Sequence, residues 1–183
     1  MQSKSTSVQS FCADQFILII FEKNCVMLFP ILTFILFFGF VVLVFWQKSD
    51  SIKKLNRQLL ESKVIITKEL KDIRCFCFAT GKRNHDFRFN KADVYILEDA
   101  LFIFGYSEFQ NLKWYKCLVI LTHREDIYKE QFPTAQIPKL YKLNLHSFNQ
   151  DVFIEFQTTP GIYSNIEIRL ENLSLEDKQL IKI

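Results

Sequence analysis

Residues 92–106 read ADVYILEDALFIFGY, and this stretch decides how the C-terminal part of the chain folds. Its two apolar runs, 92–97 and 100–106, are rich in β-branched and aromatic residues, which are favoured in strands. Only Glu98 and Asp99 stand between the runs, and two polar residues suit a tight turn. The stretch therefore predicts an antiparallel β-hairpin.

Further strands are predicted on both sides of this hairpin. Their segments show alternating or continuous apolar residues and are 74–79, 114–122, 139–146, 151–158 and 163–171. Such patterns are typical of antiparallel strands with a buried face. Ser174 can then cap a short helix, with Asp177 three places on as a variant of the capping box. The expected fold class is mainly β, with seven antiparallel strands and a C-terminal helix.

This order of elements resembles the pleckstrin-homology-like (PH-like) superfold, in which a seven-stranded antiparallel barrel is capped by a C-terminal α-helix. The resemblance covers residues 74–183 and rests on topology and pattern. Bacterial PH-like domains are often carried next to transmembrane helices. The resemblance implies a binding or scaffolding module for protein interaction.

The resemblance also points to the loop between the first two predicted strands, where PH domains often hold basic residues that bind phosphate. The candidate lipid- or phosphate-binding residues are Lys82, Arg83, Arg88 and Lys91. An arginine can grip phosphate oxygens through two donors. Asn90 stands where the PH pattern has an Arg, and Asp86 partly neutralises the loop. Sensing of an anionic lipid headgroup and an ordinary polar loop are therefore both open.

Residues 25–46 read CVMLFPILTFILFFGFVVLVFW and contain no charged side chain. As a helix this segment reaches about 33 Å, enough to cross a hydrocarbon core of about 30 Å. A signal peptide has a shorter apolar region and a small-residue cleavage site, which residues 47–50 do not offer. The segment is predicted to be a permanent transmembrane helix. Residues 1–24 are expected to form an N-terminal tail, unless Met27 is the true start and residues 1–26 are not translated.

The basic residues near the predicted span are distributed unevenly. Upstream are Lys4 and Lys23, whereas downstream are Lys48, Lys53, Lys54, Arg57 and Lys63. The positive-inside rule then places the C-terminal domain in the cytoplasm, at the cell membrane. The cysteines of this domain, Cys75, Cys77 and Cys117, are expected to be reduced thiols in that compartment.

Residues 47–73 contain no Pro or Gly and are predicted to form a basic helical linker. Its juxtamembrane basic residues, Lys48, Lys53, Lys54 and Arg57, either set the topology or contact anionic headgroups. Apolar residues recur every seven positions at Ile52, Leu59, Ile66 and Ile73. The second set of positions that a coiled coil needs to be apolar is partly polar here. A weak homodimer through the linker and a single amphipathic helix are therefore both hypotheses.

The remaining features exclude several functions. The formal net charge of +3 does not indicate a nucleic-acid partner. Cys75 and Cys77 lack a second cysteine pair for a zinc site, and no catalytic motif is present, so we expect no cofactor, no metal and no enzyme activity. The long connection 123–136 contains Tyr128 and Phe132, which either pack on the domain or face a partner.

Overall fold

In a computed structural model of the chain, the first 45 residues and residues 46–183 form two separate units. Side chains are described from Pro30 onward. The backbone is described for residues 6–62, 64–80, 85–110, 112–139, 141–147, 151–157 and 165–183.

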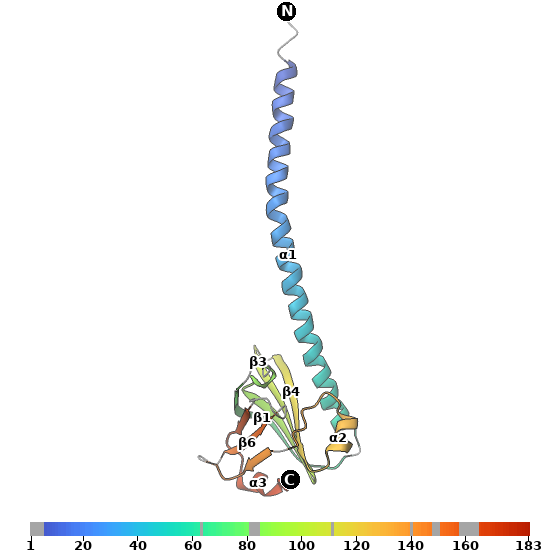
Figure 1. The fold of residues 1–183 in the computed structure, drawn as a ribbon, viewed down its shortest axis with the longest axis vertical. Helices are drawn as coiled ribbons and strands as arrows, with labels where there is room; N and C mark the ends of the chain where they lie inside the picture. Colours follow the sequence, from blue (N-terminus) through green and yellow to red (C-terminus); the bar gives the residue numbers. More distant parts are fainter. Residues whose placement is uncertain are drawn as a thin grey trace, which may run out of the picture. The chain divides into compact units, whose positions relative to one another are not determined.

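A single helix, α1 (Thr6–Glu61), begins in the first unit and ends in the second (Figure 1). From Pro30 it is long and apolar enough to cross a membrane, a property that it shares with signal sequences near an N-terminus. Its apolar side chains between Ile31 and Trp46 are largely exposed to solvent, as expected of a lipid-facing surface. Residues 6–24, predicted as a tail, belong to this helix instead.

The predicted helical linker is too long. The helix ends at Glu61, and β1 (Ile66–Ala79) occupies the residues that the prediction gave to its second half. Residues 64–67 read VIIT, and such a run of β-branched side chains favours a strand over a helix. Long-range pairing of β1 with the next strand then outweighs the local helix preference of residues 68–73.

Seven strands form one antiparallel sheet in the order β4-β3-β2-β1-β7-β6-β5. The strands that follow β1 are β2 (Lys91–Leu97), β3 (Ala100–Phe109), β4 (Leu112–Thr122), β5 (Tyr141–Asn144), β6 (Val152–Gln157) and β7 (Asn165–Leu170). The first half of β1 pairs with β2, and its second half, from Cys75 onward, pairs with β7. This strand thereby joins β2–β4 to β5–β7.

The predicted barrel is not closed, because β4 and β5 lie at opposite ends of the strand order and do not pair. A short segment after β4 covers its outer edge instead. Gln136 donates its backbone N–H to the carbonyl of Leu118 over 2.8 Å, and Ile120 donates to the carbonyl of Gln136 over 2.9 Å. Within the described residues, β5 pairs with β6 alone.

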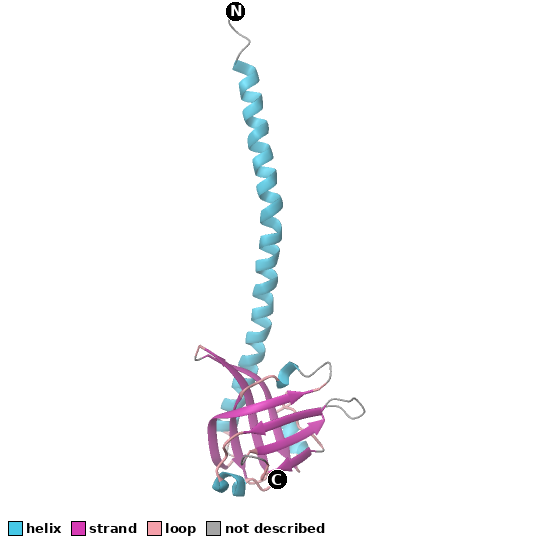
Figure 2. Ribbon diagram, turned by 90° about the vertical axis from the view of Figure 1, so that its left-hand side faces the viewer, coloured by secondary structure: helices cyan, strands magenta, loops and turns pink. Residues whose placement is uncertain are grey.

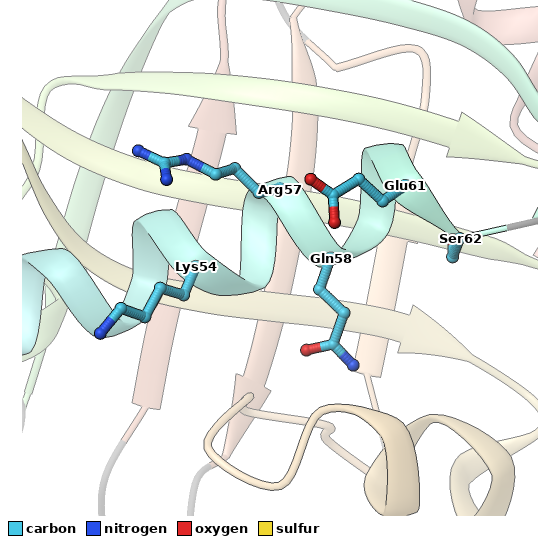
Figure 3. Close-up of a pocket in the computed structure, with 5 residues that line it drawn as sticks. All are labelled: Lys54, Arg57, Gln58, Glu61 and Ser62. Atoms are coloured by element: carbon cyan, nitrogen blue, oxygen red, sulfur yellow. The ribbon is translucent and has the colours of Figure 1, made fainter.

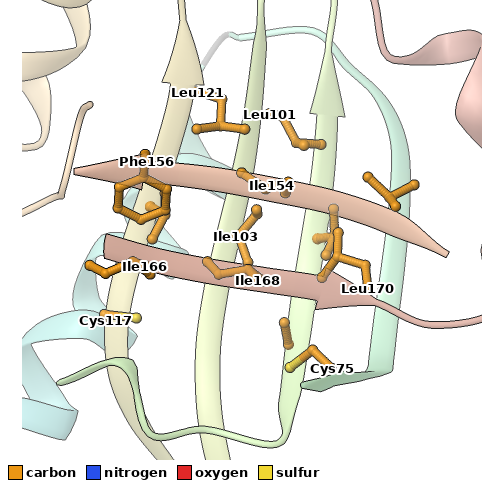
Figure 4. Packing of buried hydrophobic residues seen from close by; sticks show 14 of the residues in the cluster. Cys75, Leu101, Ile103, Cys117, Leu121, Ile154, Phe156, Ile166, Ile168 and Leu170 are labelled. Carbon is orange, nitrogen blue, oxygen red and sulfur yellow. The ribbon is translucent and has the colours of Figure 1, made fainter. Parts of the chain in front are cut away.

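The main core lies between the two halves of the sheet, where β6 and β7 cross the strands behind them (Figure 4). The inward residues of β6 and β7 include Ile154 and Ile168, which are fully buried and meet Ile103 and Val119 from the other half. These residues alternate with outward ones, which are polar except for Phe153.

A second core covers the outer face of β2–β4. Ile52 and Leu59 of α1 pack there together with Tyr128 and Phe132. Tyr128 lies in α2 (Glu125–Gln131), a short helix within the long connection 123–136, and Phe132 follows it. Both side chains are buried, so they pack on the domain rather than face a partner. Because both faces of β2–β4 are covered, these strands are apolar along most of their length.

The second core also bears on the predicted dimer seam. Ile52 and Leu59 are buried in the domain of their own chain, and Ile66 and Ile73 lie in β1 rather than on a helix. The heptad spacing therefore does not form a coiled-coil stripe.

The chain ends with α3 (Leu175–Leu180), which confirms the predicted C-terminal helix. Ser174 Oγ accepts a hydrogen bond from the backbone N–H of Asp177 over 3.1 Å, as the capping pattern predicts. Ile181, immediately after the helix, is buried in the main core and anchors this end of the chain.

Candidate functional site

One end of the C-terminal domain carries the predicted basic loop and the part of α1 around Lys48 and Ser49. Lys48 of α1 forms an ion pair with Asp86, which lies in η1 (His85–Phe87) between β1 and β2. One residue further on, Ser49 Oγ accepts a hydrogen bond from the backbone N–H of Tyr115, near the start of β4, over 3.0 Å. We call this the proximal end; it contains Trp46, η1 and the β3–β4 turn, and the opposite end is the distal end.

The structure describes two of the four predicted phosphate-binding residues. Arg88 is exposed at the proximal end. Lys91, at the start of β2, is only partly exposed and forms an ion pair with Glu108 of β3. Lys82 and Arg83 lie outside the described residues. Of the described pair, only Arg88 presents its charge openly to solvent.

The juxtamembrane basic residues are also partly neutralised. Lys48 pairs with Asp86, and Lys54 pairs with Asp50 one helical turn away over 3.1 Å. Lys53 is half-buried and Arg57 is exposed. Exposed ion pairs contribute little stability, so they leave these side chains able to exchange partners.

A shallow depression of about 520 Å³ lies along the last turns of α1 (Figure 3). Its lining residues are Lys54, Arg57, Gln58, Glu61 and Ser62. Gln58 Nε2 donates to the backbone carbonyl of Gln131 over 3.1 Å and so ties the helix to the end of α2. Because the depression is wide open and is lined by both basic and acidic side chains, it lacks the features of a specific anion-binding site.

A charge cluster, formed by the buried Asp93 and the partly exposed Asp72 and Lys113, has only a weak signal in the sequence. Asp93 is a polar residue on the apolar outer face of β2, and its side chain is only 3% exposed. Tyr115 Oη donates to it over 2.8 Å, the backbone N–H of Asp72 donates over 3.1 Å, and Lys113 Nζ donates over 3.3 Å. These donors satisfy a carboxylate that would otherwise be costly to bury.

Asp72 completes the cluster from a bulge in β1, with φ at 58°. Lys113 Nζ lies 2.8 Å from its carboxylate, and Tyr106 donates its hydroxyl to it. The hydrogen bonds from Lys113 and then Tyr106 lower the pKa of Asp72 below its ordinary value. Partial burial lowers the pKa of Lys113, but the bond to Asp72 and the charge of Asp93 outweigh it, and the net shift is upward. This arrangement stabilises the sheet beneath α1.

No group of three or more His, Cys, Asp or Glu residues in the described part of the chain has the geometry of a metal site. Cys75, Cys77 and Cys117 are free thiols. Burial raises the pKa of Cys77 to about 12 and also raises the pKa values of Cys75 and Cys117. A thiol with so high a pKa is a poor nucleophile and a poor metal ligand at neutral pH.

The edge strand β5 is the other feature that the domain offers for binding. Its side chains alternate, with Tyr141 and Leu143 packed against the main core, and Lys142 and Asn144 exposed. The hydroxyl of Tyr141 is buried and has no hydrogen-bond partner among the described residues. Within the described residues, β5 pairs with β6 alone, so the other backbone edge of β5 has no strand beside it.

The comparisons with known proteins add no further constraint: the chain matches no protein-family model, no curated protein and no solved structure.

Proposed function

We propose that this chain is a single-pass membrane protein whose C-terminal domain is a PH-like binding module in the cytoplasm. The strand order β4-β3-β2-β1-β7-β6-β5, followed by a C-terminal helix, supports the PH-like assignment. The length and apolar character of α1 from Pro30 support the membrane span. The excess of lysine and arginine after the span supports the cytoplasmic orientation.

The module's proposed ligand is an extended segment of a partner protein, and its proposed place is the edge of β5. A single observation carries this proposal: the sheet does not close, and β5 pairs with β6 alone within the described residues. A strand edge offers N–H and C=O groups to an added strand, and side-chain pockets beside it give specificity. The 123–136 connection is a weaker candidate because Tyr128 and Phe132 are buried in the second core.

Photo-crosslinking in native membranes tests this function. A photoreactive amino acid is placed at Lys142 or at Asn144 of β5, and in matched variants at Lys129 of α2 or at Glu98 of the β2–β3 turn, which are also exposed. We expect one defined protein to crosslink from both β5 positions and from neither control.

Hydrogen exchange then tests the mode of binding. Adding the purified partner to the full-length protein should slow amide exchange in residues 141–144, because strand addition protects edge amides. Equal crosslinking at all four positions, or no protection of β5 by the crosslinked protein, would count against this function.

Sensing of anionic headgroups is a second proposal, supported by the exposed Arg88 at the proximal end. It predicts that residues 46–183 bind anionic vesicles in a salt-sensitive way and that Arg88→Ala weakens binding. Arg124→Ala, at the distal end and 60% exposed in its side chain, is the matched control. Equal binding of both variants would contradict the role of Arg88.

A further inference from the structure

Two large apolar side chains lie exposed at the tip of the β3–β4 hairpin. Phe109 is 68% exposed and Leu112 is 61% exposed. The two residues pair directly across the strands, and Gln110, which follows Phe109, has φ at 46°. Side chains of directly paired residues project from the same face, so these two form one apolar tip.

The hairpin projects beyond its neighbour in the sheet. Lys91, the first residue of β2, pairs with Tyr106, so, among the described residues, residues 107–109 of β3 pair only with β4. Figure 2 shows this hairpin extending past the neighbouring strands. This projecting part is amphipathic. The half-buried Trp114 lies on the same face as the apolar tip, whereas Glu108 and Lys113 lie on the other face, each engaged in an ion pair.

The tip also lies at the proximal end, where the apolar part of the chain joins the domain. Ser49 contacts Tyr115 near the start of β4, and Gln58 contacts Gln131, which follows the end of β4. This part of α1 therefore runs in the same direction as β4, and its earlier residues lie towards the β3–β4 turn. From Tyr115 to Leu112 the strand covers about 10 Å. From Ser49 to Trp46 the helix covers about 4.5 Å. The tip therefore extends at least to the level of Trp46, which is 62% exposed and directly follows apolar residues 25–45.

We propose that the β3–β4 tip enters the headgroup and acyl boundary of the bilayer that α1 crosses, and so forms a second membrane contact. The inference rests on the proposed membrane span. Tryptophan and other aromatic side chains are favoured at this boundary, and a small apolar tip is stabilised there by burial. Because Glu108 and Lys113 are already paired, the contact is apolar and does not depend on anionic lipid.

Lipid photo-crosslinking with the full-length protein tests this contact. The protein is reconstituted in vesicles of neutral phosphatidylcholine, with p-benzoylphenylalanine in place of Phe109 or Leu112. Leu175, which is 60% exposed on α3, gives the matched control position. Resistance to alkaline carbonate extraction establishes that each variant is integrated. We expect phosphatidylcholine adducts at positions 109 and 112, equal at low and high salt, and none at position 175.

A second variant checks that the tip acts as a unit. With the photoreactive residue at position 112, Phe109→Asp should reduce the lipid adduct several-fold, because a charged side chain opposes entry into the boundary. Both side chains are exposed, so the fold is not at risk. An integrated protein without lipid adducts at 109 and 112, or with adducts to another protein chain there, overturns the proposal. A protein extracted by carbonate overturns the proposed span as well, and crosslinking at β5 tests the proposed partner separately.

Discussion

The backbone N–H of Tyr115 in β4 donates a hydrogen bond to Ser49 Oγ in α1 over 3.0 Å, and both residues are buried. With Ile52 and Leu59 packed on the same face of the sheet, this contact makes the end of α1 part of the domain's fold. A fragment that begins after α1 would expose the apolar outer face of β2–β4. Experiments on the isolated domain should therefore use residues 46–183, which include this part of α1.

Removing the helix contact should destabilise the domain. Leu59 is fully buried whereas its neighbour Leu60 is 50% exposed. Leu59→Ala should lower the free energy of unfolding by about 2–5 kcal/mol, and Leu60→Ala should change it by less than about 0.5 kcal/mol. Urea unfolding of the full-length protein in non-ionic detergent, followed by circular dichroism, measures both values. Equal effects of the two substitutions would show that α1 does not pack on the sheet.

The buried carboxylate of Asp93 should be needed for stability. Asp93→Ala leaves the Tyr115 hydroxyl and the backbone N–H of Asp72 without their acceptor, and Lys113 keeps Asp72 as its carboxylate partner. This change should lower the free energy of unfolding by about 2–4 kcal/mol. Glu98→Ala, at an exposed turn residue, provides the control. The same unfolding measurement applies, and a loss below about 1 kcal/mol for Asp93→Ala would contradict the role of the cluster.

Asp72 should make the domain sensitive to acid. Its pKa is lowered in the folded protein, mainly by the hydrogen bond from Lys113, relative to about 3.9 in an unfolded chain. The stabilisation is thus complete above about pH 4 and is lost as the pH falls through the folded pKa. Asp72→Asn does not titrate and should lose less stability between pH 7 and pH 3 than the unsubstituted protein does.

The side chain of Asp72 is 54% exposed, so this difference should be modest, about 1 kcal/mol or less. Asparagine also tolerates the left-handed backbone conformation at this position. Stability measured at both pH values checks the prediction, and an identical decline in the two proteins would refute it.

The thiols of the C-terminal domain should be unreactive in the folded protein. Burial raises the pKa of Cys77 to about 12 and also raises the pKa of Cys75, so almost no thiolate is present at pH 8. Maleimide labelling followed by peptide mass spectrometry should modify Cys75, Cys77 and Cys117 only after unfolding. Rapid labelling of Cys75 or Cys117 in the native protein would show that the core is more open than the structure describes.

Gly105 in β3 should tolerate no side chain. A Cβ atom there would lie 2.6 Å from the ring of Phe89, which covers this glycine. Gly105→Ala should therefore lower the free energy of unfolding by about 1–3 kcal/mol. Gly39→Ala is the control, since nothing lies within 4 Å of that position and alanine favours a helix. Thermal unfolding of both variants in detergent gives the comparison, and an unchanged Gly105→Ala protein would mean that Phe89 moves away easily.

The sequence predicts the elements whose pattern is local. The hairpin of 92–106, the alternating strands β6 and β7 and the Ser174 cap are confirmed because each depends on neighbouring residues. The helical assignment of 66–73 is wrong because this segment is decided by its pairing with β2, which is distant in sequence. Ile52 and Leu59, seven residues apart, do lie on one face of α1, but that face packs against the outer face of the sheet rather than against a second helix.

The candidate site was predictable only in part. The basic character of the first loop can be read directly, but the pairing of Lys91 with Glu108 requires the register of β2 and β3. Barrel closure also depends on long-range geometry. The segment around Gln136 covers the edge of β4, and no sequence pattern predicts this contact. The charge cluster at Asp93 had one weak signal, an acidic residue within an apolar strand.

Protease accessibility in oriented membrane vesicles tests whether α1 anchors this domain at the cytoplasmic face of the membrane. The full-length protein is produced in bacterial cells, and inside-out and right-side-out vesicles are treated with proteinase K. We expect an intact chain in the carbonate-resistant membrane fraction, with residues 46–183 digested only in inside-out vesicles. Digestion in right-side-out vesicles alone, or a soluble domain lacking its N-terminal segment, would contradict this expectation.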